Sequence, residues 1–178
     1  MMKYMLVFVF ALSLAACGNA PEPTAAKAPA PVVADAVSTG SSKDMPALSI
    51  ETFQGQTFTL SEHRGKWVVV NFWATWCAPC LKEIPDFNAY AKSRSDVQFI
   101  GLAYEEIERA DMESFLKLHP IDYPFAILDV YNPPKDFETP RGLPMTVLIA
   151  PDGKVAKTFL GPVTTDQFTE IIDAAGTP

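Results

Sequence analysis

The chain has 178 residues and carries 14 Lys or Arg side chains against 21 Asp or Glu side chains, so its formal net charge is −7. This acidic balance argues against nucleic acid as a partner, because binding to a phosphate backbone needs a basic face. It also argues against electrostatic attachment to anionic lipid, so any contact with a membrane should be made by acyl chains.

The first 17 residues have the layout of a secretory signal. Lys3 precedes an apolar run of about 13 residues, which is shorter than the ~20 residues that a membrane-spanning helix needs. The run ends in Leu-Ala-Ala-Cys at Cys17, which resembles a bacterial lipobox. That resemblance implies cleavage before Cys17 and a diacylglyceryl group on its sulfur. The alternative is an ordinary signal peptide with a free Cys17, and Gly18 leaves the choice between inner and outer membrane open.

The next segment, residues 18–45, is dominated by Ala, Pro and Ser. This composition cannot bury a core, so we expect a disordered tether that holds the rest of the chain away from a membrane. Residues 46–178 then form one domain, which is long enough to build an apolar core. If Cys17 is acylated, Cys77 and Cys80 are the only thiols left. An exported pair lies in an oxidising compartment, so a reductase there must be re-reduced by a partner.

The order of the elements predicts a mixed α/β fold. Alternating apolar residues around 54–56 predict an N-terminal β-hairpin. Apolar runs predict five strands and helical periodicity predicts three helices: strands over 67–72, 96–104, 124–128, 145–150 and 154–160, and helices over 77–93, 109–118 and 164–175. Pro85 should kink the first helix. Parallel strands joined by helices, with a hairpin turn at 151–153, give a mixed central sheet flanked by helices, with a central α-β insert.

Cys77 and Cys80 lie where the strand over 67–72 ends and a helix begins. The unpaired N–H groups and the partial positive charge of a helix N-terminus favour a thiolate over a thiol. We therefore expect Cys77 to have a lowered pKa and to attack disulfides. Cys80, one turn further in, should be more buried and should resolve the mixed disulfide.

Half of a zinc site is the alternative interpretation of these two cysteines. Tetrahedral zinc needs two more ligands. The chain has only His63 and His119 to offer, and neither shows ligand spacing. We expect both histidines to be surface or satisfied core residues, and we expect no metal and no cofactor.

Three motifs resemble the TlpA/ResA/DsbE group of thioredoxin-like proteins: FWATWCAPCLKEIP at 72–85, GLPMTVLI at 142–149 and PDGK at 151–154. The resemblance covers essentially the whole domain and implies a thioredoxin-like fold. It implies a membrane-anchored thiol-disulfide oxidoreductase on the periplasmic side of the cell envelope, most often a reductase that serves cytochrome c maturation or copper-site assembly. Its partners would be the disulfides of exported apoproteins and a membrane dithiol donor of the DsbD or CcdA kind. We expect a monomer.

The same resemblance assigns a substrate site beside the cysteines. Trp76 would cover the thiol pair, and Trp73 is expected to be packing. Pro144 matches the family's cis-proline, which would leave the backbone of Leu143 free to pair with a substrate peptide beside Cys77. Met145 stands where many relatives carry a small polar residue, so the groove is expected to differ there.

Three acidic residues are candidates for tuning the thiol pair. Glu83 lies three residues after Cys80, on the same helical face, and relatives of the ResA type place an acid at this offset. A partly buried carboxylate there would have a raised pKa and could exchange a proton with Cys80. On position alone a solvated helix glutamate would be the commoner case, and it is the resemblance that favours the functional role. Glu105 and Glu106 end the second sheet strand, where α/β folds carry sites. A solvated acidic loop is the interpretation that we favour for this pair.

Three other functions compete with this one. A general periplasmic oxidant or antioxidant dithiol protein differs from a reductase only in its reduction potential. A peroxiredoxin wants Thr or Ser three residues before its reactive Cys and a Pro further upstream, where this chain has Ala74 and Val70. A copper-delivery protein of the Sco type needs thiols separated by three residues and a supporting His, whereas two residues separate them here.

Overall fold

The computed structural model describes residues 43–176. The expected signal segment, the lipobox Cys17 and nearly all of the expected tether lie outside the described residues. Within the described part of the chain, no helix combines the length and the apolar character needed to cross a membrane.

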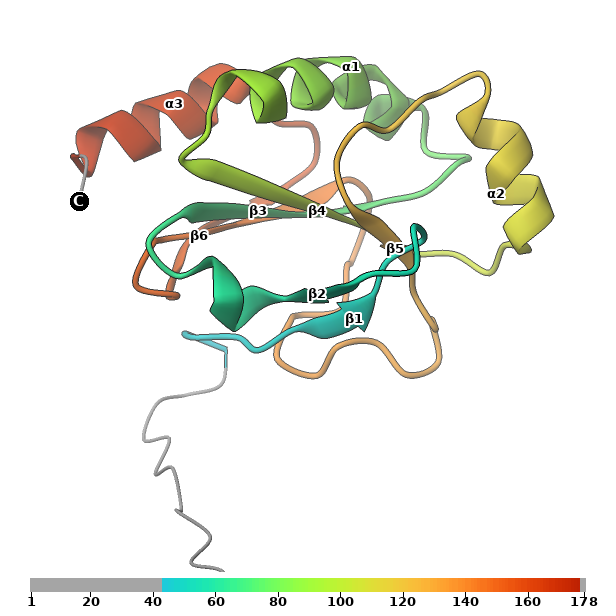
Figure 1. The fold of residues 1–178 in the computed structure, drawn as a ribbon, viewed down its shortest axis with the longest axis horizontal. Helices are drawn as coiled ribbons and strands as arrows, with labels where there is room; N and C mark the ends of the chain where they lie inside the picture. Colours follow the sequence, from blue (N-terminus) through green and yellow to red (C-terminus); the bar gives the residue numbers. More distant parts are fainter. Residues whose placement is uncertain (1–42, 177–178) are drawn as a thin grey trace, which may run out of the picture. The chain divides into compact units, whose positions relative to one another are not determined.

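A five-stranded mixed sheet forms the centre of the domain, in the order β5-β4-β3-β6-β7 (Figure 1). The strands are β3 (Trp67–Trp73), β4 (Val97–Ala103), β5 (Phe125–Ile127), β6 (Met145–Ile149) and β7 (Val155–Leu160). β3, β4 and β5 run parallel, whereas β6 is antiparallel to β3 and to β7. All seven residues of β3 are buried, as expected for a central strand that is covered on both faces. The predicted mixed sheet is therefore confirmed.

Helices α1 (Ala78–Ser93) and α3 (Thr165–Ala174) lie on one face of this sheet, and α2 (Arg109–Leu116) lies at the β5 side (Figure 1). The opposite face is covered by the hairpin of β1 (Ser49–Glu51) and β2 (Thr57–Thr59), which is followed by the short 3-10 helix η1 (Leu60–His63). A backbone hydrogen bond of 2.7 Å from Phe53 N–H to the carbonyl of Phe125 ties the hairpin to β5. The predicted N-terminal hairpin is thus present.

The two faces of the sheet carry separate apolar clusters, because side chains alternate along each strand. Val68, Val70 and Phe72 of β3 pack toward the hairpin. Val69 packs under α1 and α3, and Trp73 packs close to the two cysteines. Trp73 is fully buried, which confirms the prediction that it is a packing residue.

The ends of several elements follow the local signals in the sequence. α1 continues through Pro85 to Ser93 as one helix. Gly153, in the predicted hairpin turn between β6 and β7, adopts a φ of 94° that favours glycine. Thr164 N–H donates a hydrogen bond to Gln167 Oε1 at 3.0 Å, which forms the expected capping box at the start of α3.

Candidate active site

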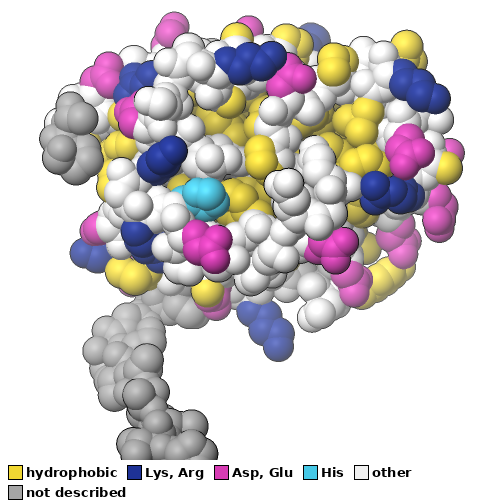
Figure 2. Space-filling view, viewed as in Figure 1, with side chains coloured by type: hydrophobic (Ala, Val, Ile, Leu, Met, Phe, Trp, Pro, Cys, Tyr) yellow, Lys and Arg dark blue, Asp and Glu magenta, His cyan; other side chains and the backbone are white. Residues whose placement is uncertain are grey.

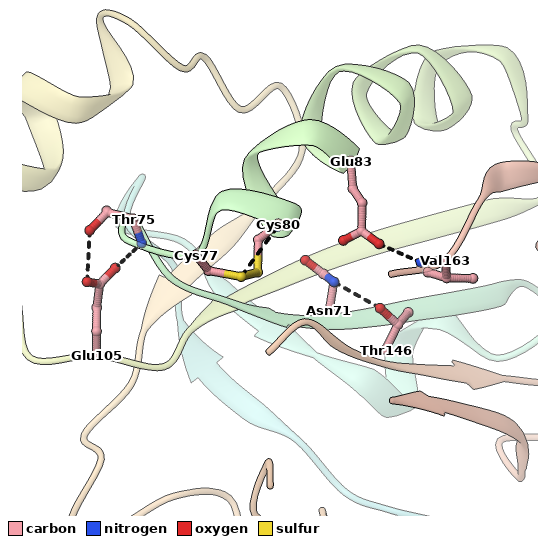
Figure 3. Close-up of a disulfide and its surroundings, with 8 residues drawn as sticks. All are labelled: Asn71, Thr75, Cys77, Cys80, Glu83, Glu105, Thr146 and Val163. Carbon is pink, nitrogen blue, oxygen red and sulfur yellow. Dashed lines mark hydrogen bonds between the residues drawn. A yellow bond between two sulfur atoms is a disulfide. The ribbon is translucent and has the colours of Figure 1, made fainter. Parts of the chain in front are cut away.

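The two cysteines of the domain form a disulfide at the junction of β3 and α1 (Figure 3). Cys77 is the N-cap of α1, and Cys80 lies in the first turn. The Sγ atom of Cys77 accepts a hydrogen bond from the N–H of Cys80 at 3.3 Å. Pro79 lies in the first turn of α1, where N–H groups make no helical hydrogen bond, so the missing N–H of proline costs nothing. The sulfur of Cys77 therefore lies at the positive end of the helix dipole, which stabilises negative charge on it once the disulfide is reduced.

Both cysteines are buried, whereas the neighbouring Trp76 is exposed. Cys77 is 4% exposed and Cys80 is 1% exposed, in the expected order. Of the two residues between the cysteines, Ala78 is exposed and Pro79 is partly buried. Trp76, directly before Cys77, is 69% exposed. The Trp76 side chain thus offers a large apolar surface to a binding partner. That it covers the thiol pair stays a prediction.

The Leu143–Pro144 peptide bond is cis, as predicted. Leu143 is partly buried and packs against the apolar cluster that contains both cysteines. Met145 is buried, and its side chain belongs to the cluster on the hairpin face of the sheet. Its side chain therefore lies in the core, because β6 turns it to the face opposite α1. The expectation that Met145 alters the groove has no support from its side-chain position.

Glu83 lies one turn beyond Cys80 on α1 and is only 7% exposed. Its Oε1 atom accepts a hydrogen bond of 2.6 Å from the N–H of Val163, at the segment between β7 and α3 (Figure 3). Its Oε2 atom has no hydrogen-bond partner among the described residues. Burial raises the pKa of Glu83 from its ordinary value of 4.5 to about 7, and the bond from Val163 partly opposes this. The expected burial and raised pKa of this carboxyl are both found.

The favoured interpretation of Glu105 as a solvated acid is wrong. Glu105 is 9% exposed, and its two carboxylate oxygens accept bonds from the backbone N–H of Thr75 at 2.6 Å and from the Thr75 hydroxyl at 2.9 Å (Figure 3). The end of β4 brings this acid beside the turn that leads into Cys77. Glu106, the next residue, is exposed and accepts a 3.3 Å bond from the hydroxyl of Tyr131. Only one member of the pair therefore contacts the active-site turn.

A buried polar pair in the sheet was missed by sequence reasoning. Asn71 of β3 is 1% exposed, and its Nδ2 donates a hydrogen bond of 2.9 Å to Oγ1 of Thr146 on β6. The two residues are directly opposite in the register. In Figure 3 the Asn71 side chain rises from β3 toward the space between the disulfide and Glu83. The available signal was a single polar residue within the apolar run of β3.

The two histidines have separate surroundings. The ring of His63 stacks on Phe58 with centroids 4.5 Å apart, and that of His119 stacks on Phe115 at 4.8 Å. Residues 43–176 contain no group of three or more His, Cys, Asp or Glu side chains that could hold a metal ion. Figure 2 shows Lys or Arg and Asp or Glu side chains interspersed on the face in view, without a continuous basic patch on that face.

Comparison with known proteins gives consistent matches. The Redoxin family model matches residues 40–175. The chain is 36% identical over 132 residues to thiol-disulfide oxidoreductase ResA of Bacillus subtilis, covering 73% of this chain and 72% of that protein. A thioredoxin family thiol:disulfide interchange protein from Chlorobium tepidum superposes with a TM-score of 0.61 at 29% identity, over 74% of this chain and 94% of the other. StoA of Bacillus subtilis has the same fold, with a TM-score of 0.61 at 23% identity, over 72% and 97% of the two chains.

Proposed function

Since this chain belongs to the Redoxin family and is a thiol-disulfide oxidoreductase, we propose that it reduces disulfides of specific exported proteins. It works outside the cytoplasm, lipid-anchored to a membrane through Cys17. The observation that carries the proposal is the Cys77–Cys80 disulfide at the N-terminus of α1. This arrangement joins a stabilised sulfur anion to a resolving thiol one turn away.

Cys77 is the nucleophile in this proposal. In the reduced protein its thiolate attacks one sulfur of a client disulfide, so a bond forms between Cys77 and the client while the client's S–S bond breaks. The leaving client sulfur departs as a thiolate and takes a proton from solvent. The N–H of Cys80, which lies 3.3 Å from Cys77 Sγ, stabilises the attacking thiolate.

Cys80 completes the reaction with Glu83 as its base. The thiol proton of Cys80 passes to the Glu83 carboxylate, and the resulting thiolate attacks Cys77 Sγ. The mixed disulfide breaks, the second client sulfur leaves, and the Cys77–Cys80 disulfide forms, so two electrons have moved to the client. A pKa of about 7 lets Glu83 take up and release a proton near neutral pH.

The client would bind beside Cys77 along the backbone of Leu143. Within residues 43–176, the structure gives the N–H and C=O of Leu143 no hydrogen-bond partner. An extended client segment can pair with such free groups, as in other cases of strand addition. The exposed ring of Trp76, directly before Cys77, supplies a further apolar contact.

The physiological direction is reduction, and the clients belong to cytochrome c maturation or copper-site assembly. The similarity to ResA proteins supports a specialised oxidoreductase. A membrane dithiol protein of the DsbD or CcdA kind then returns electrons to the Cys77–Cys80 disulfide. The reduction potential separates this role from that of a general oxidant: a value of about −120 mV would overturn the reductase direction.

Trapping tests the client role. Cys80→Ser should accumulate mixed disulfides with exported proteins through Cys77, because the resolving thiol is absent. The matched control, in which both cysteines are Ser, should trap nothing. Mass spectrometry of the trapped species identifies the clients, and finding none in cells that grow by cytochrome-dependent respiration would count against the maturation role.

Fractionation tests the anchor. With Cys17→Ser, the protein should move from the membrane fraction to the soluble fraction of the envelope, because the acyl chains can no longer be attached. The variant keeps Cys77 and Cys80, so its purified form should still reduce a disulfide substrate. Unchanged membrane association of the variant would exclude lipidation at this position.

A further inference from the structure

The helix-facing side of the sheet contains a row of small and polar residues beneath α1. Gly101 of β4 pairs in register with Asn71 of β3, which pairs with Thr146 of β6. Asn71 and Thr146 are both buried, and Gly101 has no side chain. The next row toward the cysteines holds Trp73, which is fully buried. The apolar core is therefore interrupted by a polar compartment under the helix that carries the cysteines.

Three buried polar side-chain atoms lack a hydrogen-bond partner among the described residues: Trp73 Nε1, Glu83 Oε2 and the Tyr123 hydroxyl. The rings of Trp73 and Tyr123 both lie against Gly101. A Cβ atom at Gly101 would lie 3.0 Å from Trp73 Nε1 and 3.2 Å from Tyr123 Cε2, the ring carbon next to the one that bears the hydroxyl. Leaving a buried polar group unpaired costs about 1–3 kcal/mol. Gly101 is the in-register neighbour of Asn71, toward which Glu83 points (Figure 3), so the three unpaired groups border the same part of the core and point to a shared partner.

Glu83 enters the same compartment from above. Its side chain points from α1 toward β3, and Asn71 points up from β3 toward it (Figure 3). Val163 N–H occupies Oε1, so Oε2 is the oxygen that gains and loses the proton. Burial chiefly raises the pKa of Tyr123, and the charge of Glu83 raises it further, in agreement with their closeness.

We propose that Tyr123 and Trp73 are positioning residues that hold Glu83 Oε2, through one internal water molecule, in both of its protonation states. A buried water needs two to four polar partners, and these three groups with the nearby Asn71 carboxamide provide them. A tyrosine hydroxyl can donate to the bridging water when Oε2 is ionised or accept from it when Oε2 is protonated, whereas an indole N–H only donates. Both groups stabilise the ionised carboxylate more than the neutral carboxyl, because a hydrogen bond to a charged group is the stronger one, and only Tyr123 can also serve the protonated form.

This inference deepens the proposed function, because it concerns the carboxyl that we assign as the base for Cys80. The groups that face Glu83 come from several elements. Cys80 of α1 and Tyr123, which precedes β5, are titratable. The remaining groups are uncharged: Trp73 and Asn71 of β3, Thr146 of β6 and the N–H of Val163. Loss of the Tyr123 hydroxyl thus removes a donor to the bridging water without altering a charged neighbour.

The test is a carbon-13 NMR titration of the Glu83 carboxyl in the full-length oxidised protein. With the disulfide intact, neither cysteine titrates, so a failure of the catalytic proposal cannot affect the result. The wild-type midpoint should be about 7, and Tyr123→Phe should raise it by about one pH unit, because one stabilising hydrogen bond to the charged form is lost. Tyr90 lies on the same helix as Glu83, but its hydroxyl bonds to Thr169. Tyr90→Phe should therefore leave the midpoint unchanged.

An unchanged midpoint in Tyr123→Phe, or an equal rise in both variants, would overturn the proposal. A second measurement needs no Tyr123 variant. In the wild-type protein, the indole N–H resonance of Trp73 should follow the Glu83 titration with the same midpoint, and in Glu83→Gln this response should disappear. A Trp73 resonance that stays constant through the Glu83 titration would refute the shared site even if Tyr123→Phe did not fold.

Discussion

Replacing Glu83 with Gln should make the oxidised protein more stable at alkaline pH and less active. Gln keeps nearly the same volume and an oxygen that can accept the N–H of Val163, but it cannot ionise. In the wild-type protein, burial raises the pKa of Glu83 from 4.5 to about 7. The folded chain therefore binds this proton more tightly than the unfolded chain.

The raised pKa fixes the direction of the pH dependence. The stabilisation from proton binding is fully present below pH 4.5 and is lost as the pH rises through about 7. A pKa difference of this size is worth about 3 kcal/mol. Because the side chain is only 7% exposed, solvent screening removes little of this energy. The wild type should lose about 3 kcal/mol from this group on going from acid to alkaline pH, and Glu83→Gln should lose none of it.

Urea unfolding of the oxidised proteins at pH 4.5 and about pH 8.5 measures this difference. Glu83→Gln should match the wild type at the acid pH and exceed its free energy of unfolding by about 3 kcal/mol at the alkaline pH. Glu106→Gln, at an exposed acid, is the control and should show no such gain. An equal offset at both pH values, or a loss at alkaline pH, would refute the reasoning. Resolution of a trapped mixed disulfide by Cys80 should be slower in Glu83→Gln, because the base is missing.

Two further substitutions test the surroundings of the site. Gly101→Ala should lower the free energy of unfolding by about 1–3 kcal/mol, since the added methyl group would lie only 3.0 Å from Trp73 Nε1 and 3.2 Å from Tyr123 Cε2. Urea unfolding measures this loss, and a neutral result would mean that the core around Gly101 can expand. Glu105→Ala should cost about 2 kcal/mol, because the N–H of Thr75 loses its buried acceptor. Glu105→Gln, which keeps an acceptor, should cost less, and equal losses in the two variants would show that the hydrogen bond is not the cause.

The position of the thiol pair could be predicted because its signals are local. An apolar strand, a Cys-Ala-Pro-Cys segment and the opening of a helix follow one another without interruption, and the chemistry of a helix N-terminus then applies to Cys77. Glu83 lies three residues from Cys80 on one helix, but its role could be predicted only with the added resemblance to relatives of the ResA type, which place an acid at this offset. The hairpin turn at Gly153 and the capping box at Thr164 are likewise short-range patterns.

What only the tertiary structure decided depends on contacts between distant segments. Glu105 reaches Thr75 across 30 residues, Asn71 reaches Thr146 across 75, and Val163 reaches Glu83 across 80. Each of these contacts requires a strand register or a helix position that no single segment specifies, because a shift of one residue would turn the side chain to the other face. The sequence by itself thus determined the redox pair, the order of the elements and the acid beside Cys80. The packing of β3, β4 and α1 determined which acids are buried, and so which of them can hold a proton next to the sulfur atoms.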